Sequence, residues 1–299
     1  MTIVTVFYLL VSKLSSVVKI PYNERKSMKH ISLDHPLARG RTADVYKWDD
    51  GYVLKLFHHW FPLEDIEYEL RSARAVHASG IKSPVAHELI RVNGRNGLVY
   101  DRVNGESMAA MLQHKPWKLF ACAKTLAQLH ARMHDFVFGA DMPKQRGKLQ
   151  RKIENAPALP TPLKTALLTV LHSLPESDCV CHGDFHFDNV LLTKSESVII
   201  DWMDASRGNP LADVARTSII LLGIVENREM HNPALKFLGR VFHSIYLREY
   251  FRLRPQGRAE YIRWLPIVAG ARLSEQIPEL EGWLTAKAEE IYQYIGMEQ

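Results

Sequence analysis

The secondary-structure pattern of the sequence changes at about residue 103. Before this point short apolar and β-branched runs predict strands, and after it apolar residues recur at helical spacing. The clearest strand pair, 44–48 and 52–57, flanks an Asp-Gly turn, which is the strongest short-range hairpin signal. One helix is expected between residues 62 and 79. The first hundred residues therefore predict a small antiparallel sheet with one helix.

The remainder of the chain is predicted to be mainly helical, with one hairpin inside it. Residues 118–134 place apolar side chains on one helical face, whereas 189–192 and 198–201 are strand-like. We predict an α+β fold, with a small antiparallel-sheet lobe and a larger helical lobe. The expected parts are a peripheral N-terminal extension at 1–27, a sheet lobe at 28–103 and a helical lobe at 104–299.

Composition excludes several classes of protein. The 299 residues are 46% hydrophobic and 24% charged, which is ordinary globular usage. The net charge of +5 is spread along the chain without the basic stripe of a nucleic-acid-binding protein. The apolar run at 3–11 is far shorter than the roughly 20 residues that span a bilayer, so we expect no membrane partner. Three cysteines give no disulfide framework, and a reducing cytoplasm is the natural location.

The densest group of polar residues is His182-Gly183-Asp184, followed by Asn189. Asp201 comes twelve residues after Asn189, at the far end of the predicted hairpin. An amide and a carboxylate at the two ends of a short hairpin are expected to converge. Such oxygen ligands, completed by phosphate oxygens, suit a hard divalent cation. Asp184 is in position to accept the proton of an attacking hydroxyl.

The pattern H-G-D-x-x-x-x-N followed by I-D-W resembles the catalytic signature of the aminoglycoside phosphotransferase/choline kinase superfamily. The resemblance implies a protein-kinase-like bilobal fold and Mg²⁺-dependent transfer of the γ-phosphate of ATP, or of GTP, to a hydroxyl of a small molecule. It implies Asp184 as the catalytic base, with Asn189 and Asp201 as magnesium ligands. It further implies that His182 braces the loop through its ring and that Asp213 hydrogen-bonds the loop backbone.

The same resemblance implies that Lys55 is the lysine that binds the ATP phosphates. This lysine needs an acidic partner on the following helix, where Glu64, Glu67 and Glu69 are candidates. Glu69 lies three residues after Ile66 and shares its apolar helical face. A carboxylate on an apolar face is costly unless it is paired, so a Lys55–Glu69 ion pair is predicted.

The phosphate-binding loop and the adenine site are less sharply defined. Residues 38–45 hold a single glycine, Gly40, where protein kinases carry three. Backbone amides and the Thr42 hydroxyl are expected to cradle phosphate. The backbone near Tyr100 and Arg102 resembles the hinge that meets adenine.

The acceptor is left open by the sequence, as are the oligomeric state and the choice between ATP and GTP. A cationic acceptor needs an acidic pocket, and the candidates for it are Glu275, Glu279 and Glu281 near the C-terminus with Asp188 and Asp204 near the loop. The alternative interpretation of these acids is a solvated helix face.

Two other functions compete with a small-molecule kinase. A protein Ser/Thr kinase is disfavoured by Gly183, where arginine is usual, and by Trp202 after Asp201, where phenylalanine is usual. An inactive relative that only binds a nucleotide or a partner is disfavoured because Asp184, Asn189 and Asp201 are all present.

Overall fold

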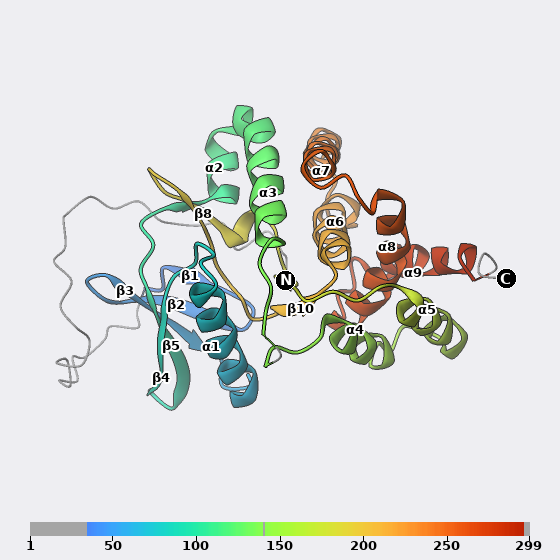
Figure 1. Ribbon diagram of the computed structural model, residues 1–299. Coiled ribbons are helices and arrows are strands. Elements are labelled where there is room, and N and C mark those ends of the chain that lie inside the picture. The colour runs from blue at the N-terminus through green and yellow to red at the C-terminus, as the bar shows by residue number, and fades with distance from the viewer. Residues whose placement is uncertain (1–34, 140, 296–299) are drawn as a thin grey trace. The chain divides into compact units, whose positions relative to one another are not determined.

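The computed structural model describes residues 35–139 and 141–295 (Figure 1). The N-terminal extension predicted at 1–27 lies outside the described residues. The chain forms two compact units, called here the sheet unit (35–111 and 191–203) and the helical unit (112–190 and 204–295). The structure thus has the predicted α+β composition. Residues 104–111 and 191–203, which the sequence analysis assigned to the helical lobe, group with the sheet unit.

The sheet unit is built around a five-stranded antiparallel sheet in the order β1-β2-β3-β5-β4. Its strands are β1 (Ala38–Arg39), β2 (Ala43–Asp49), β3 (Tyr52–Phe57), β4 (Ala86–Val92) and β5 (Arg95–Asp101). The predicted Asp-Gly hairpin joins β2 to β3, and Gly51 at its tip has the positive φ of 92° that such a turn requires. Helix α1 (Leu63–Ala78) packs on β4 and β5 (Figure 1). Its residues Ile66 and Ala73 are buried in the core of this unit.

The second hairpin forms a small sheet within the same unit. Its order is β6-β8-β9, from β6 (Glu106–Ser107), β8 (Val190–Leu192) and β9 (Ser197–Ile199). Helix α2 (Met108–His114) follows β6 directly. The pairing of Ser107 with Leu191 explains why the hairpin groups with the sheet unit although helices surround it in the sequence.

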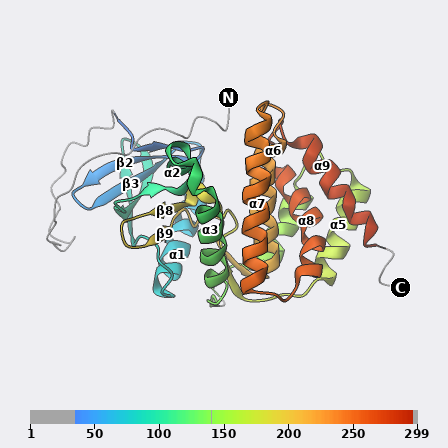
Figure 2. The same cartoon turned by 90° about the horizontal axis from the view of Figure 1, so that it is seen from above.

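The helical unit is organised around helix α6 (Pro210–Glu226), which is buried along most of its length. Its start is fixed by the Asn209 side chain, which accepts the Leu211 amide at 2.8 Å, and by Pro210 in the first turn. Helices α7 (Pro233–Leu253) and α8 (Arg258–Arg272) pack on α6, and α3 (Leu119–Met133) packs on α7 (Figure 2).

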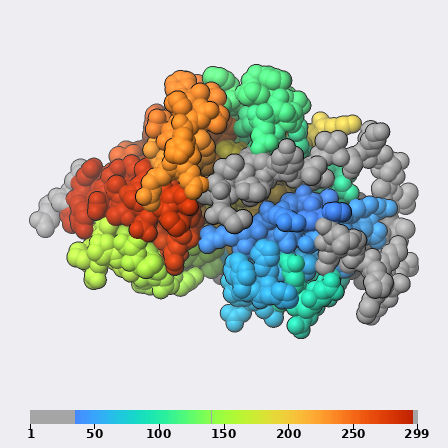
Figure 3. Space-filling view, turned by 180° about the vertical axis from the view of Figure 1, so that it is seen from behind, coloured from blue at the N-terminus to red at the C-terminus, as the bar shows by residue number. Residues whose placement is uncertain are grey.

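The remaining helices pack around this centre. They are α4 (Gln145–Glu154), α5 (Thr161–Ser173) and α9 (Glu281–Glu289), with short 3₁₀ turns at Pro116–Lys118, Phe187–Asn189, Leu273–Glu275 and Glu290–Gln293. Figure 3 shows the α5 surface lying against α8 and α9. Strands β7 (Cys179–Cys181) and β10 (Ser206–Gly208) form an antiparallel pair that leads into the predicted catalytic loop. Among the described residues, no helix combines the length and apolar character needed to cross a membrane.

Candidate active site

A buried ion-pair cluster lies where β3 meets α1 in the sheet unit. The Lys55 Nζ lies 2.8 Å from Glu69 Oε1 and 2.9 Å from Asp201 Oδ1. Strand alternation places Lys55 on the α1 side, because its neighbours Leu54 and Leu56 are fully buried on the other face of the sheet. The predicted Lys55–Glu69 ion pair is therefore present, and Asp201 joins it.

The charged groups of this cluster interact strongly, because Glu69 is buried beside Lys55. The Glu69 side chain is 1% exposed, and the Tyr100 hydroxyl donates to Glu69 Oε1 at 2.8 Å. Burial by itself lowers the pKa of Lys55, but the carboxylates of Asp201 and Glu69 outweigh that effect and raise this pKa above its usual value. Lys55 therefore keeps its positive charge at neutral pH. Its ammonium group is shared by two carboxylates, Glu69 and Asp201.

Asp201 itself is held in an unusual backbone conformation. Its φ is +64°, in the left-handed region that costs a non-glycine residue about 1–2 kcal/mol. The following Trp202 is 2% exposed, and its indole N–H donates to the Ile199 carbonyl at 3.2 Å. The buried ring fixes the turn after β9 and so aims the Asp201 carboxylate. Strain of this kind, held in place by packing, is characteristic of functional sites.

The predicted phosphate loop is a tight turn between β1 and β2. The Gly40 amide donates to the Ala43 carbonyl at 2.9 Å, and a Cβ on Gly40 would lie 2.8 Å from that oxygen. The turn thus requires glycine at position 40. The Thr42 carbonyl accepts the His58 amide at 2.8 Å, which ties the turn to the end of β3.

The predicted adenine site lies at the end of β5. The Arg102 amide donates to the Gly51 carbonyl at 2.7 Å, and the Asp101 amide donates to Val85. These two N–H groups are engaged in hydrogen bonds within the sheet unit. Tyr100 contributes its hydroxyl to Glu69, a side-chain role that the sequence analysis did not anticipate.

In the helical unit, α6 holds the predicted catalytic loop in place. Asp213 accepts the His182 amide at 2.7 Å and the Gly183 amide at 2.8 Å. Arg216 Nε donates to the Gly183 carbonyl at 3.0 Å, and the Thr217 hydroxyl donates to the Phe185 carbonyl at 2.8 Å. The three side chains are spaced i, i+3 and i+4, so they share one face of the helix. The predicted contact of Asp213 with the loop backbone is confirmed.

Cations and an imidazole surround the Asp184 carboxylate. Arg216 lies 3.3 Å from Oδ1 and His186 Nε2 lies 3.4 Å from Oδ2. Burial by itself raises the pKa of Asp184, but His186, Arg216 and Arg272 outweigh it and hold this pKa well below its usual range. Asp184 is therefore ionised at neutral pH. A carboxylate of such low basicity orients a hydroxyl by accepting its hydrogen bond more readily than it removes the proton.

Asn189, a predicted metal ligand, is hydrogen-bonded to the catalytic loop. Its Nδ2 donates to the Asp184 carbonyl at 2.9 Å, which leaves its Oδ1 as the acceptor end of the amide. The ring of His182 braces the same loop, because its Nδ1 accepts the Asp184 amide at 3.3 Å. Carboxylate and amide oxygens are the donor set that Mg²⁺ prefers. The chemistry of Asn189 and Asp201 thus fits that ion.

Behind the loop lies a buried cluster that the sequence analysis missed. His130 Nε2 and His134 Nε2 lie 3.1 and 3.4 Å from Asp213 Oδ2. Their other ring nitrogens contact the hydroxyls of Tyr246 and Tyr250 at 2.6 and 2.8 Å. Three potential metal ligands thus lie within 4.8 Å of one another, but every ring nitrogen already has a hydrogen-bond partner. The cluster is a hydrogen-bond network that fixes Asp213.

The rings of His130 and His134 predict that the folded protein loses stability in acid. Burial lowers the pKa of His130 to about 4 and also lowers that of His134, so both rings are neutral in the folded protein. Unfolded imidazoles titrate near 6.5. As the pH falls from about 6.5 to about 4, the unfolded state binds protons that the folded state does not. The free energy of unfolding should then fall by about 1.4 kcal/mol per pH unit for each ring.

Urea unfolding at pH 7, 6 and 5 measures this slope. His243, whose pKa burial also lowers to about 4, adds to it. The slope should decrease in His134→Gln and stay unchanged in His172→Gln, because His172 is exposed. An equal slope in both variants would contradict the assignment.

Gly183 predicts a second sensitive position. It has φ +80°, and a Cβ there would lie 2.5 Å from the Asp204 carbonyl oxygen. Gly183→Ala should lower the free energy of unfolding by about 2–3 kcal/mol, because strain and a backbone clash act together. Gly51→Ala is the matched control, since Gly51 also has positive φ but meets no atom within 4 Å. Equal losses of unfolding free energy in the two variants would show that the backbone shifts to relieve the clash at position 183.

The structure also revises the expected acidic acceptor pocket. Glu275 Oε1 lies 2.8 Å from Arg216, and Asp204 Oδ1 lies 3.4 Å from Lys148 and 3.5 Å from Lys152. These two carboxylates are therefore neutralised by cations, and they do not form an acidic surface. Arg216 itself was missed by the sequence analysis, although its position three residues after Asp213 places it on the face that meets the loop.

The chain is similar to known proteins in both sequence and fold. The sequence model of the Phosphotransferase enzyme family matches residues 35–254. The comparison with curated proteins gave no match. Three solved structures share the fold at low identity. The first is an aminoglycoside-3'-phosphotransferase of type VIII, with 20% identity, a TM-score of 0.52, and 80% of this chain and 87% of that chain covered.

The second solved structure is an amicoumacin kinase in complex with AMP-PNP, Ca²⁺ and Ami. It has 18% identity, a TM-score of 0.54, and coverage of 86% of this chain and 87% of that chain. The third is a choline/ethanolamine kinase family protein from Mesorhizobium loti, with 17% identity, a TM-score of 0.53 and coverage of 87% of both chains. At these identities the similarity establishes the fold.

Proposed function

Because the chain belongs to the Phosphotransferase enzyme family, we propose that it transfers the γ-phosphate of ATP, or of GTP, to a hydroxyl group of a small molecule. The observation that carries this proposal is the buried Lys55–Glu69 pair whose lysine also contacts the strained Asp201. Phosphates that bind together with a metal ion would take the place of one carboxylate at Lys55, and the metal ion would then bind the released carboxylate.

Nucleotide binding would begin with an exchange of partners at Lys55. The Lys55 ammonium would move from Asp201 to the nucleotide phosphates, while Glu69 and Tyr100 keep it in position. The freed Asp201 carboxylate, with the Asn189 amide oxygen, would hold Mg²⁺, which neutralises charge on the phosphate oxygens. The tight turn at Gly40 and Thr42 would cover the phosphates.

Asp184 would receive the acceptor. Its carboxylate, ionised because of Arg216 and His186, would accept the hydrogen bond of the acceptor hydroxyl and align its oxygen with the γ-phosphorus. As the new O–P bond forms, the bond from the γ-phosphorus to the bridging oxygen breaks and the nucleoside diphosphate leaves. The attacking hydroxyl becomes strongly acidic in this step, and its proton can then pass to Asp184 despite the low pKa of that group. Positioning and charge neutralisation therefore supply most of the rate enhancement.

The test is nucleotide consumption by the full-length protein with a panel of hydroxyl compounds. ATP and GTP are each supplied with Mg²⁺ or with EDTA, and phosphorylated products are detected by ³¹P NMR. We expect Mg²⁺-dependent consumption that needs an acceptor and is abolished in Lys55→Met. Tight AMP-PNP binding without turnover of any acceptor would favour a nucleotide-binding relative without activity.

A further inference from the structure

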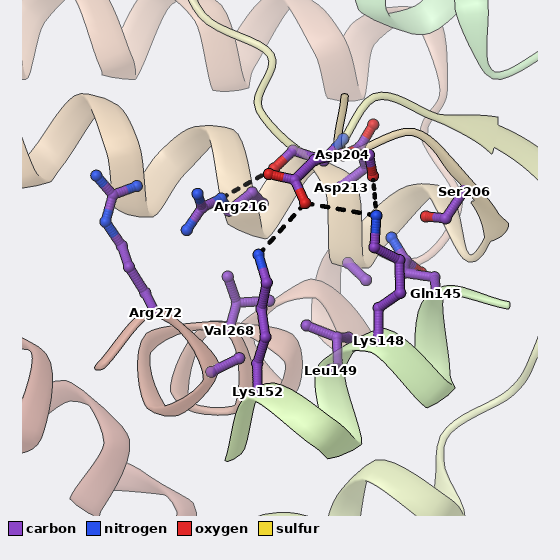
Figure 4. Close-up of a pocket in the computed structure, with 13 residues that line it drawn as sticks. Gln145, Lys148, Leu149, Lys152, Asp204, Ser206, Asp213, Arg216, Val268 and Arg272 are labelled. Carbon is purple, nitrogen blue, oxygen red and sulfur yellow. Dashed lines mark hydrogen bonds and ion pairs between the residues drawn. The ribbon is translucent and has the colours of Figure 1, made fainter. Parts of the chain in front are cut away.

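A small cavity of the helical unit lies beside the loop that carries Asp184 (Figure 4). Its volume is about 40 Å³, room for roughly three water-sized atoms. Gly183, the neighbour of Asp184, lines it. Four cationic side chains also line it, from three helices: Lys148 and Lys152 of α4, Arg216 of α6 and Arg272 of α8.

These cations converge because of helix packing. Lys148 and Lys152 are one helical turn apart, and Figure 4 shows both extending from α4 towards Asp204. Arg216 and Arg272 are largely enclosed, with side chains 12% and 10% exposed. The group is therefore a partly buried wall of the cavity and differs from a scatter of surface lysines.

The residues that line the cavity carry more positive than negative charge. Four cations line it, together with two carboxylates, Asp204 and Asp213. Asp204 contacts Lys148 and Lys152, whereas Asp213 accepts backbone amides and contacts two histidines. Two further carboxylates are not among the lining residues: Asp184 contacts Arg216, and Glu275 contacts three of the four cations, at 2.8 Å for Arg216 and 3.8 Å for Lys152 and Arg272.

The four cations are not held equally. Arg216 makes short contacts to Glu275 and to the Gly183 carbonyl, at 2.8 and 3.0 Å, which suit a residue that fixes the loop. The ion pairs of Lys152, at 3.5 and 3.8 Å, and that of Arg272 with Glu275, at 3.8 Å, are longer than these contacts. A ligand bound by Lys152 and Arg272 would leave the contacts of Arg216 with the loop in place.

We propose that the acceptor carries a carboxylate or phosphate group near its reacting hydroxyl, and that Lys152 and Arg272 bind this group. This inference rests on the proposed function. The free space has room for about three water-sized atoms, enough for the anionic oxygens of either group. An ammonium group there would meet four cations. Of the two lining carboxylates, Asp204 contacts lysines and Asp213 contacts loop amides and histidines, so simple cationic acceptors are disfavoured.

Binding of inorganic phosphate tests the anion site without any need for turnover. Equilibrium dialysis of ³²P-labelled phosphate is performed on the full-length protein with saturating Mg²⁺ and AMP-PNP, which occupy the nucleotide site. Wild-type protein should bind phosphate, and Lys152→Gln and Arg272→Gln should each weaken binding about tenfold or more. The exposed lysine variant Lys124→Gln is the control and should bind as the wild type does.

Absence of phosphate binding to wild-type protein would overturn the inference, as would an equal loss in Lys124→Gln. Circular dichroism checks that each variant is folded. Lys152 is 31% exposed, so Lys152→Gln should disturb the fold less than Arg272→Gln does.

Matched acceptors then test the link to catalysis. Glucuronate, glucose and glucosamine share a pyranose ring and differ mainly in charge, and glycerol 3-phosphate, glycerol and 3-aminopropane-1,2-diol form a second such set. We expect kcat/KM to be highest for the anionic member of a set, with that preference lost in Lys152→Gln. A preference for the amine would overturn the inference and leave the phosphotransferase proposal intact.

Discussion

Replacing Asp201 with asparagine is expected to lower kcat/KM for Mg–ATP by about 10²–10³-fold while leaving the protein folded. Asparagine adopts the left-handed backbone region more readily than other non-glycine residues, so the turn at φ +64° should survive. Lys55 keeps Glu69 as its partner. The change therefore removes a negative charge and little else, which isolates the role of Asp201 as a metal ligand.

Two measurements check this role. In turnover, the loss should be at least as large as in Asp184→Asn, because charge neutralisation is expected to outweigh hydroxyl orientation. In binding, Mg²⁺ should tighten AMP-PNP in the wild type but not in Asp201→Asn. Asp50→Asn, at an exposed turn of the sheet unit, is the control and should match the wild type. Near-normal turnover in Asp201→Asn would remove the basis of the metal assignment.

The charged pair of the sheet unit was predicted from the family resemblance together with local periodicity. The resemblance supplied Lys55, and helical spacing selected Glu69 because it shares the face of Ile66. Strand alternation places Lys55 opposite Leu54 and Leu56. A carboxylate on an apolar face requires a cation, so the two residues were expected to pair.

Contacts across long sequence separations could not be predicted in this way. Tyr100 and Glu69 are 31 residues apart, and His130 and Asp213 are 83 apart. A hydroxyl or an imidazole on an apolar face fits many partners, and only the packing of the helices selects one. The spacing of His130 and His134 at i, i+4 was the signal available, but it did not identify Asp213 as the shared acceptor.

The strand partner of the second hairpin was likewise not predictable from the sequence. The residues around 190–199 have a clear strand pattern, but that pattern does not say which strand they pair with. The partner, β6, is only two residues long, Glu106–Ser107, and too short for periodicity to detect. Both segments follow the predicted boundary at residue 103 and were assigned to the helical lobe, whereas the structure groups them with the sheet unit.

The ion pairs of the acids expected in the acceptor pocket were also not predictable from the sequence. The sequence offered Glu275 and Asp204 as free acids, because charged residues can be counted but not paired from sequence alone. The structure brings α4, α6 and α8 together and matches these acids with lysines and arginines. These two acids therefore do not supply the free negative charge that a cationic acceptor needs.

Asp213→Asn is expected to cause the largest loss of stability, about 3–5 kcal/mol in the free energy of unfolding. Asp213 is fully buried, and its two oxygens accept the amides of His182 and Gly183 and contact His130 and His134. Asparagine has one acceptor oxygen, and its NH₂ group would face a buried N–H donor. At least one buried donor then loses its partner, which alone costs about 1–3 kcal/mol.

The same change should lower kcat through the loop, although Asp213 touches no substrate in the proposed mechanism. Its loss frees the amides that hold Gly183, and with them the position of Asp184. Urea unfolding measures the stability and steady-state kinetics measures the loop effect, with kcat expected to fall more than KM rises. Asp135→Asn, which breaks an exposed ion pair with Arg254, should change stability by less than about 1 kcal/mol. A similar small effect in Asp213→Asn would mean that the loop is held by Arg216 and Thr217 alone.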